Sequence, residues 1–355
     1  MSWLDCITIF ALAGAVTGLL IPVICRLGFR WGVLDMPGQH KRHRFPTPNL
    51  GGISIFVGFW AAITFSYQHF PGLSAELGQF LYYVVAGGVI IFLIGLIDDL
   101  SGLSAMVKLC SQIIAGLILY AGGLRITILF IPFLGPIELG YSSLPVTLLW
   151  LVGVTNSINL IDGLDGLAAG VSAIAALALL FVGIAFSLMT VIVFAAAIIG
   201  SSLVFLYFNH YPAKIFMGDS GSLFLGYLFA VISVLFPIKS YTAAAVFVPL
   251  AALGVPILET VVSFIRRTIT GQKFYKADNR HLFHYLTGLG LSTPQVVWAF
   301  YVVSAFCALF SGAMFIVNRR VVITVLLVFM VVILAILYRF MGTQMRRNRE
   351  DEDRW

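Results

Sequence analysis

The sequence predicts an all-α protein, a polytopic membrane helix bundle with about 11 transmembrane helices. Hydrophobic residues make up 60% of its 355 positions and charged residues only 10%, whereas a soluble domain carries about 25% charged residues. Apolar stretches of about 20 residues, the length that crosses a bilayer as a helix, recur along the chain. We expect one integral membrane domain over residues 1–345, followed by a charged cytoplasmic tail over residues 346–355.

Each apolar stretch is assigned one span in chain order. The expected spans are 4–27, 51–70, 79–97, 107–123, 144–161, 167–186, 188–208, 220–238, 242–265, 294–317 and 321–340. The start, MSWLDCITIF, holds an acid and no basic segment before its apolar run. We therefore expect the first span to be a retained helix and not a cleaved signal peptide.

The distribution of positive charge predicts the orientation. With a periplasmic N-terminus and a cytoplasmic C-terminus, 17 Lys and Arg residues fall inside and 4 outside, in agreement with the positive-inside rule. The pair Arg319–Arg320 is the one local exception. The longest outer loop, 124–143, alternates weakly and carries Pro-Gly turn signals, which predicts a small hairpin.

The most polar stretch between two apolar runs is 155–170, TNSINLIDGLDGLAAG. Asp162 and Asp165 are three residues apart and share one face of a helical turn, next to Asn156 and Asn159. Such a cluster at a membrane boundary is costly unless it has a function. The alternative is a helix contact in which Asn and Asp serve as caps.

Two more acidic stretches fall on the same, cytoplasmic side. Asp98 and Asp99 end the third span, and Lys108 follows at the start of the next helix, where it can pair with an acid or with a lipid phosphate. Asp219 and Gly218 lie in KIFMGDSGSLFLG at a helix N-terminus, which favours an anion or a phosphate–metal complex. The alternatives are solvated acids at Asp98–Asp99 and simple capping of the next helix by Asp219 or Ser220.

Two basic stretches complete the cytoplasmic side. Residues 35–52 carry Lys41 and His43 before a rigid Pro-x-Pro segment, which suits either a phosphate-binding loop or contact with anionic lipid headgroups. Residues 278–290, DNRHLFHYLTGLG, carry Arg280, His281 and His284. Zinc is not expected there, because no third nitrogen or sulfur ligand is evident.

Together these stretches indicate a Mg²⁺ site for phosphate chemistry, with Mn²⁺ as an alternative cation. Mg²⁺ binds through one or two carboxylates plus substrate phosphates. No GxxxxGK[ST], HExxH or GxGxxG pattern occurs, which excludes ATPase, zinc protease and Rossmann classes. An ion-coupled transporter is a rival class, although no inverted repeat is visible; an inactive membrane scaffold is another.

The quoted motifs resemble those of the polyprenyl-phosphate N-acetylhexosamine-1-phosphate transferase superfamily. Its cytoplasmic signatures are similar, in the same order, to GVLDMPGQHKRHRFPTPNLGGISIFVG, DDL, NSINLIDGLDGL, FMGDSGSLFLG and the histidine stretch. The bacterial undecaprenyl-phosphate GlcNAc-1-phosphate transferase branch is the most similar. Its eleven spans also suit this chain, whereas the branch that transfers MurNAc-pentapeptide phosphate has ten.

The resemblance implies transfer of GlcNAc-1-phosphate from UDP-GlcNAc to undecaprenyl phosphate at the cytoplasmic face of a bacterial inner membrane. It implies the start of a surface polysaccharide such as O-antigen, no nucleic-acid partner, and a possible homodimer. Other UDP-N-acetylhexosamines, with QuiNAc, FucNAc or MurNAc-pentapeptide, are alternatives. The implied roles are catalytic for Asp98, Asp99, Asp162, Asp165, His281 and His284, metal-binding for Asp219 and Asn159, and substrate-binding for Lys41, His43, Lys108, Asn156, Gly218 and Arg280.

One residue departs from the family pattern. The histidine motif commonly reads His-x-His-His, whereas this chain has HLFH, with Phe283 at the middle position. The departure puts in doubt any role of a middle histidine and bears on the sugar specificity.

Overall fold

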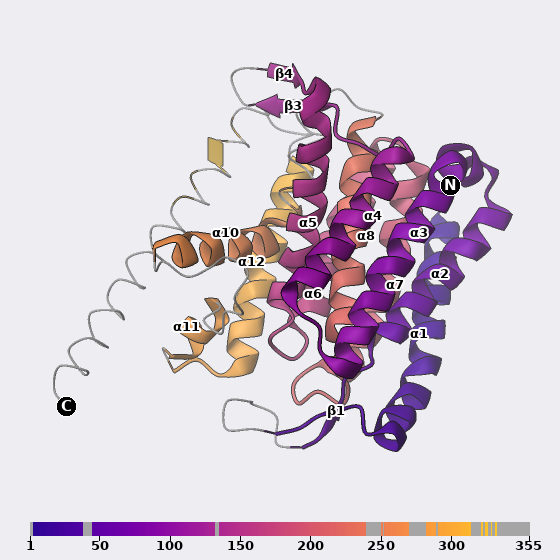
Figure 1. Ribbon diagram of the computed structural model, residues 1–355. Helices are drawn as coiled ribbons and strands as arrows, with labels where there is room; N and C mark the ends of the chain where they lie inside the picture. The colour runs from indigo at the N-terminus through magenta and orange to yellow at the C-terminus, as the bar shows by residue number, and fades with distance from the viewer. Residues whose placement is uncertain are drawn as a thin grey trace.

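The structure is a bundle of long helices that lie side by side (Figure 1). The computed structural model describes residues 3–37, 45–131, 135–238, 250, 252–269, 282–288 and 290–313, with 321, 324, 325, 328 and 331. Its helices are α1 (Trp3–Trp31), α2 (Gly52–His69), α3 (Pro71–Ser101), α4 (Ala105–Ala121), α5 (Ser143–Ile161), α6 (Leu167–Ala185), α7 (Met189–Asn209), α8 (Gly218–Ile238), α10 (Gly254–Ile269), α11 (Leu282–Gly288) and α12 (Thr293–Ala313).

The helical membrane bundle expected from composition is confirmed. Within the described residues, 7 helices are long and apolar enough to cross a membrane, and two shorter apolar helices accompany them. Most bounds lie within a few residues of the expected spans, except that α3 begins at Pro71, eight residues before the expected start at 79. The count of eleven spans and the orientation of the termini stay predictions.

The ninth expected span, 242–265, is described only in part, because residues 242–249 and 251 lie outside the described residues. The described helix there, α10, begins at Gly254 and continues to Ile269, beyond the expected end. In Figure 1 it runs across the direction of its neighbours. Gly254 allows this crossing, because a Cβ atom at that position would lie 2.9 Å from Cys307 Sγ of α12. Hydropathy identifies an apolar segment, but it does not specify the direction in which that segment runs.

Helices α6, α7 and α8 form the centre of the bundle. In the most apolar 18-residue segment of each of these helices, 72%, 72% and 83% of the residues are buried, compared with 28–39% in the other candidate spans. Small residues let neighbouring backbones approach: a Cβ atom at Gly200 of α7 would lie 2.2 Å from the Phe10 carbonyl oxygen of α1. The N-terminal end of α8, which carries Asp219, therefore projects from the most buried part of the molecule.

Two small antiparallel pairs of strands lie at opposite ends of the bundle (Figure 1). The pair β3 (Ile128–Ile131) and β4 (Gly135–Glu138) confirms the hairpin expected in the outer loop. The pair β1 (Leu34–Asp35) and β2 (Thr47–Pro48) was not expected, and it closes the first basic loop.

Backbone hydrogen bonds then fasten the strand pair β1–β2 to the segment before α8. Phe216 N donates to Pro48 O at 2.8 Å, and Gly51 N donates back to Phe216 O at 2.9 Å. Gly52 N donates to Met217 O at 2.8 Å. Residues far apart in the sequence are thereby brought to the end of the bundle that holds the acidic stretches.

Candidate active site

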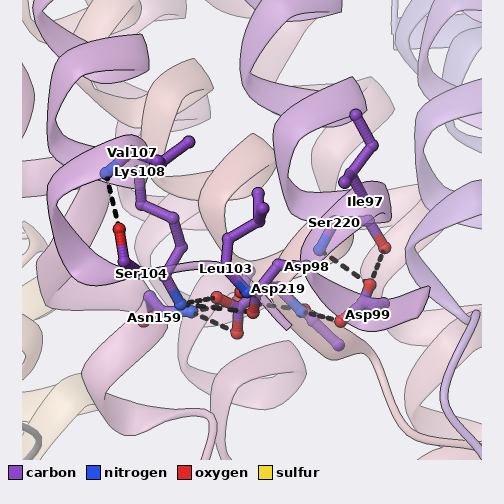
Figure 2. A network of polar contacts seen from close by, with 12 residues as sticks. Ile97, Asp98, Asp99, Leu103, Ser104, Val107, Lys108, Asn159, Asp219 and Ser220 are labelled. Carbon is purple, nitrogen blue, oxygen red and sulfur yellow. Dashed lines mark hydrogen bonds and ion pairs between the residues drawn. The ribbon is translucent and has the colours of Figure 1, made fainter. Parts of the chain in front are cut away.

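Four helix ends meet around the acidic residues. The C-terminal ends of α3 and α5 carry Asp98, Asp99 and Asn159, and the N-terminal ends of α4 and α8 carry Lys108 and Asp219. Figure 2 shows Lys108, Asn159, Asp98 and Asp219 directed toward one another, and Asp99 directed toward Ser220. Three sequence stretches that were interpreted separately thus form one polar network.

Lys108 lies between two carboxylates. Its Nζ atom is 3.2 Å from Asp98 Oδ2 and 2.8 Å from Asp219 Oδ2 (Figure 2). The three side chains are 25%, 16% and 25% exposed, respectively, so the pairs are partly shielded from water. Ser104 caps α4 by accepting a hydrogen bond from Val107 N at 3.4 Å, which places Lys108 in the first turns of that helix.

The second oxygen of Asp98 is bound to the turn that follows α3. Leu103 N donates to Asp98 Oδ1 at 2.6 Å, and Gly102 adopts a positive φ of 71° to end the helix. The turn therefore fixes Oδ1 and leaves Oδ2 directed at Lys108.

Asp99 has a different surrounding from its neighbour. It serves as the N-terminal cap of α8, although it belongs to α3. Asp219 N donates to its Oδ1 at 2.7 Å, and Ser220 donates to its Oδ2 through N at 3.0 Å and through Oγ at 2.6 Å. Asn49 Nδ2 adds a contact to Oδ1 at 3.4 Å. A carboxylate suits this place, because helix N-termini present unpaired N–H groups and a partial positive charge.

Gly218 makes this capping contact possible. Its φ of 70° lies in the left-handed region, and an added Cβ atom would lie 2.5 Å from Asp99 Oδ2. The glycine of the motif therefore serves the approach of a carboxylate from α3.

Asn159 orients Asp219. Its Nδ2 atom donates to Asp219 Oδ1 at 3.0 Å and to Ser222 Oγ at 2.9 Å. The two oxygens of Asp219 are thus held by two different donors, Asn159 and Lys108. Because both amide protons of Asn159 are used, its oxygen is the atom available to a cation.

Asp162 has no hydrogen-bond donor to its carboxylate among the described residues. It follows α5 directly and is half-buried. Burial, first, and repulsion by Asp219, Asp99 and Asp165 raise the pKa of this carboxyl group well above its usual range. A cation in its vicinity would relieve this cost.

Asp165 and Asn156 lie in separate polar contacts. Ala213 N donates to Asp165 Oδ2 at 2.9 Å, which ties the acidic turn to the loop before α8. Asn156 Nδ2 donates to Gln112 Oε1 at 2.6 Å, and Gln112 Nε2 donates back to Asn156 Oδ1 at 3.3 Å. The structure therefore shows positions for both residues but no direct contact with Lys108.

Two aromatic side chains pack on the glycines of the acidic turn. The ring of Phe283 is 2% exposed and lies so close to Gly163 that a Cβ atom there would be 2.3 Å from its Cζ atom. Tyr301 of α12 donates to Gly166 O at 2.7 Å, while Gly166 N donates to Asn209 Oδ1 at 3.0 Å. The residue that departs from the family pattern thus contacts the motif that carries Asp162.

Five predicted site residues lie wholly or partly outside the described residues. Lys41, His43, Arg280 and His281 lie outside the described residues, and for His284 only the helical backbone of α11 is described. Sequence reasoning missed other contributors. Ser220 was expected as a helix cap and not as a donor to Asp99, and for Asn209, Gln112 and Tyr301 no spacing in the sequence indicated a long-range contact.

The donor set suits a hard cation that substrate helps to bind. Within the described ranges, no group of three His, Cys, Asp or Glu side chains is arranged to hold a metal ion alone. Carboxylate oxygens from Asp98 and Asp219 nevertheless converge on one positive charge. This arrangement fits Mg²⁺, which uses one or two carboxylates and takes its other ligands from water and phosphates.

Comparison with known proteins gives the family. A family model described as Glycosyl transferase family 4 matches residues 81–237, which include the acids from Asp98 to Asp219. The chain is 34% identical, over 286 residues, to the "Probable undecaprenyl-phosphate N-acetylglucosaminyl 1-phosphate transferase" of Bacillus subtilis (strain 168), covering 80% of this chain and 78% of that protein. The chain belongs to glycosyl transferase family 4. The predicted resemblance is therefore confirmed.

Other family members are similar over comparable lengths. The "Decaprenyl-phosphate N-acetylglucosaminephosphotransferase" of Mycobacterium tuberculosis (strain ATCC 25618 / H37Rv) is 34% identical over 81% of this chain and 77% of its own length. The "Phospho-N-acetylmuramoyl-pentapeptide-transferase" of Bacillus velezensis is 30% identical over 82% of this chain and 91% of its own length. Two of these three names carry N-acetylglucosamine and one carries N-acetylmuramoyl-pentapeptide, and each name includes a phosphate or phospho group and a transferase.

Proposed function

We propose that the protein transfers GlcNAc-1-phosphate from UDP-GlcNAc to undecaprenyl phosphate, giving undecaprenyl-diphospho-GlcNAc and UMP. The observation that carries the proposal is the convergence of Asp98, Lys108 and Asp219 at one end of a helical membrane bundle. The names of the similar proteins from Bacillus subtilis and Mycobacterium tuberculosis support the chemistry and the sugar.

The reaction exchanges one phosphorus–oxygen bond for another. An oxygen of the lipid phosphate bonds to the sugar-bearing β-phosphorus of UDP-GlcNAc, and the bond from that phosphorus to the UMP oxygen breaks with its electron pair leaving on UMP. Catalysis of such transfers consists mainly of positioning and charge stabilisation. A phosphate monoester has a second pKa near 6, so the lipid phosphate needs little help to lose its proton near neutral pH. We therefore favour direct attack over an aspartyl-phosphate intermediate.

A Mg²⁺ ion would be held by Asp219 and Asp98, with the amide oxygen of Asn159 beside them. When bound, it supplies charge neutralisation to the diphosphate and to the UMP leaving group. Asp162 then shapes the diphosphate site, and its unfavourable charge at that place makes binding of the cation more favourable. Asp99 acts through α8 by holding the backbone that carries Asp219.

The remaining roles are assigned to the surrounding residues. Lys108 binds a phosphate of the substrates. Asp165 is assigned to the uridine, and Asn156 is assigned to substrate binding. Gly218 lets Asp99 reach α8. The phosphates and the sugar are expected to contact Lys41, His43, Arg280, His281 and His284.

The cellular setting follows from the same proposal. The protein resides in the bacterial inner membrane with its site toward the cytoplasm, because that is the side on which 17 Lys and Arg residues are expected. Its product starts a surface polysaccharide such as O-antigen, and a homodimer is proposed for its assembly. The acids lie at helix ends and not at mid-membrane, which supports a transferase over a transporter.

The test uses purified full-length protein with undecaprenyl phosphate, Mg²⁺ and a panel of UDP-sugars, and it measures UMP release. We expect UMP from UDP-GlcNAc. Release from a QuiNAc, FucNAc or MurNAc-pentapeptide nucleotide instead would keep the chemistry and change the sugar. No release from any donor by folded protein would contradict the proposed function.

A further inference from the structure

Lys108 occupies a place that a metal ion would also take. Its ammonium group contacts the Oδ2 atoms of Asp98 and Asp219, which belong to two different helices, α3 and α8. Mg²⁺ prefers the same carboxylate oxygens. One gap between two carboxylates cannot hold an ammonium group and a divalent ion together, so the two cations exclude each other there.

The carboxylates of Asp98 and Asp219 need a positive charge between them whether or not metal is bound. Partly buried carboxylates that face each other without a counter-ion destabilise a folded protein. Among the described residues, the ion pairs at this cluster are the two made by Lys108, and the charge of Asp99 is directed to the α8 N-terminus. Lys108 therefore keeps Asp98 and Asp219 together when no metal is bound.

The Lys108 side chain can also move away from the two carboxylates. It is 25% exposed, and its side chain is a flexible four-carbon stem. The ammonium group at the end of this stem binds phosphate as a point charge. The helix that holds it is capped at Ser104, so the side chain can move while α4 stays in place.

We propose that Lys108 is a resident counter-ion that the metal displaces from Asp98 and Asp219, and that its freed ammonium group then binds substrate phosphate. The inference rests on the proposed function for the last step, but the displacement itself concerns protein and metal alone. The order of binding follows: metal loading makes Lys108 available to the phosphate, so the phosphate site forms fully only after the cation is bound.

The first test measures Mn²⁺ binding by electron paramagnetic resonance with purified full-length protein and no substrate. Lys108→Met removes the competing ammonium group, so Mn²⁺ should bind roughly five- to tenfold more tightly than to the wild type, as expected from loss of partly exposed ion pairs. Lys214→Met is the matched control, because it removes an exposed lysine in the loop before α8; it should bind Mn²⁺ as the wild type does. Equal or weaker Mn²⁺ binding by folded Lys108→Met would overturn the proposal.

A second test needs no variant and so covers the case in which Lys108→Met does not fold. Wild-type protein is acylated at lysines, with and without Mn²⁺, and modification of Lys108 and Lys214 is followed by mass spectrometry. Mn²⁺ should increase modification of Lys108 several-fold and leave Lys214 unchanged. Unchanged or reduced modification of Lys108 at saturating Mn²⁺ would contradict displacement. Neither result depends on UMP release, which tests the proposed function separately.

Discussion

At the residue scale, neighbouring acids of one motif have different tasks. Asp98 directs an oxygen at Lys108, whereas both oxygens of Asp99 accept hydrogen bonds from α8. Successive residues of an α-helix point about 100° apart. Adjacent carboxylates at the end of α3 therefore face different neighbours, and equal effects of their substitution are not expected.

Asp219→Asn tests the metal assignment. The amide keeps an oxygen for the hydrogen bond from Asn159 but loses the charge that attracts a divalent ion. We expect Mg²⁺-dependent UMP release to fall by about 100-fold or more, with a circular dichroism spectrum like that of the wild type. Glu138→Gln, in the exposed strand β4, is the control. Normal turnover in Asp219→Asn would disprove Asp219 as a ligand.

Asp162 predicts a pH dependence of stability in the absence of metal. The pKa of Asp162 in the folded protein lies above the unfolded value of about 3.9. Between these two pKa values the folded state binds more protons than the unfolded state, so the protein loses stability as the pH rises from one to the other. Asp162→Asn removes this loss. In EDTA, the melting temperature of the variant should exceed that of the wild type by an amount that grows from pH 5 to pH 8. A difference independent of pH would show that the charge of Asp162 is not the cause.

At the element scale, the site depends on contacts between helix ends. The α8 N-terminus is capped by a side chain of α3, and the start of α6 is held between α7 and α12 through Gly166. The starts of α6 and α8 are therefore positioned by side chains from other helices.

Asp99→Asn should destabilise the fold more than Asp98→Asn does. The new amide group at Asp99 would oppose either Asp219 N–H or the Ser220 donors, and a buried donor without an acceptor costs about 1–3 kcal/mol. Asp98→Asn loses a partly exposed ion pair, which contributes about 0–1 kcal/mol. Thermal unfolding of both variants in EDTA measures the difference. The reverse order would contradict the capping role of Asp99.

Tyr301→Phe should cost about 1 kcal/mol of stability, the contribution of one hydrogen bond. The variant loses the bond to Gly166 O and keeps the ring that packs on Gly170. Thermal unfolding measures the effect, and Tyr207→Phe at an exposed position of α7 is the control. A loss of equal size in the control would show that the bond to Gly166 has no special importance.

At the scale of the whole molecule, a rigid centre supports a site at one end. Helices α6 to α8 are the most buried candidate spans, and α8 carries Asp219 in its first turn. Burial on all sides restricts how far these helices can shift, so the acids are held in place before substrate arrives. Lys108, Asp98 and Asp219 are partly exposed, so cations and phosphates can reach them.

Removal of metal should therefore stop the reaction without unfolding the bundle. EDTA is expected to abolish UMP release from UDP-GlcNAc, and added Mg²⁺ or Mn²⁺ to restore it, while helical content measured by circular dichroism stays constant. Turnover that persists in EDTA would show that residues such as Lys108 neutralise the diphosphate by themselves.

The membrane class, most helix bounds, the hairpin of residues 128–138 and the acidic stretches that the structure brings together could all be predicted from the sequence alone. These properties depend on local composition: about 20 apolar residues make a span, and motifs such as DDL and FMGDSGSLFLG lie where spans end. Each could be predicted without knowing how the helices pack.

Which residues contact one another depends on how the helices pack, and the sequence did not predict it. Lys108 and Asp219 are separated by 111 positions, and Asp99 and Ser220 by 121. The contact of Phe283 with Gly163 is equally remote in sequence. Hydropathy gives the length of a helix but neither its rotation nor its direction, as α10 illustrates. Those are set by packing between helices, which is why a pair of adjacent acids divides into one residue that faces a cation and one that caps a helix.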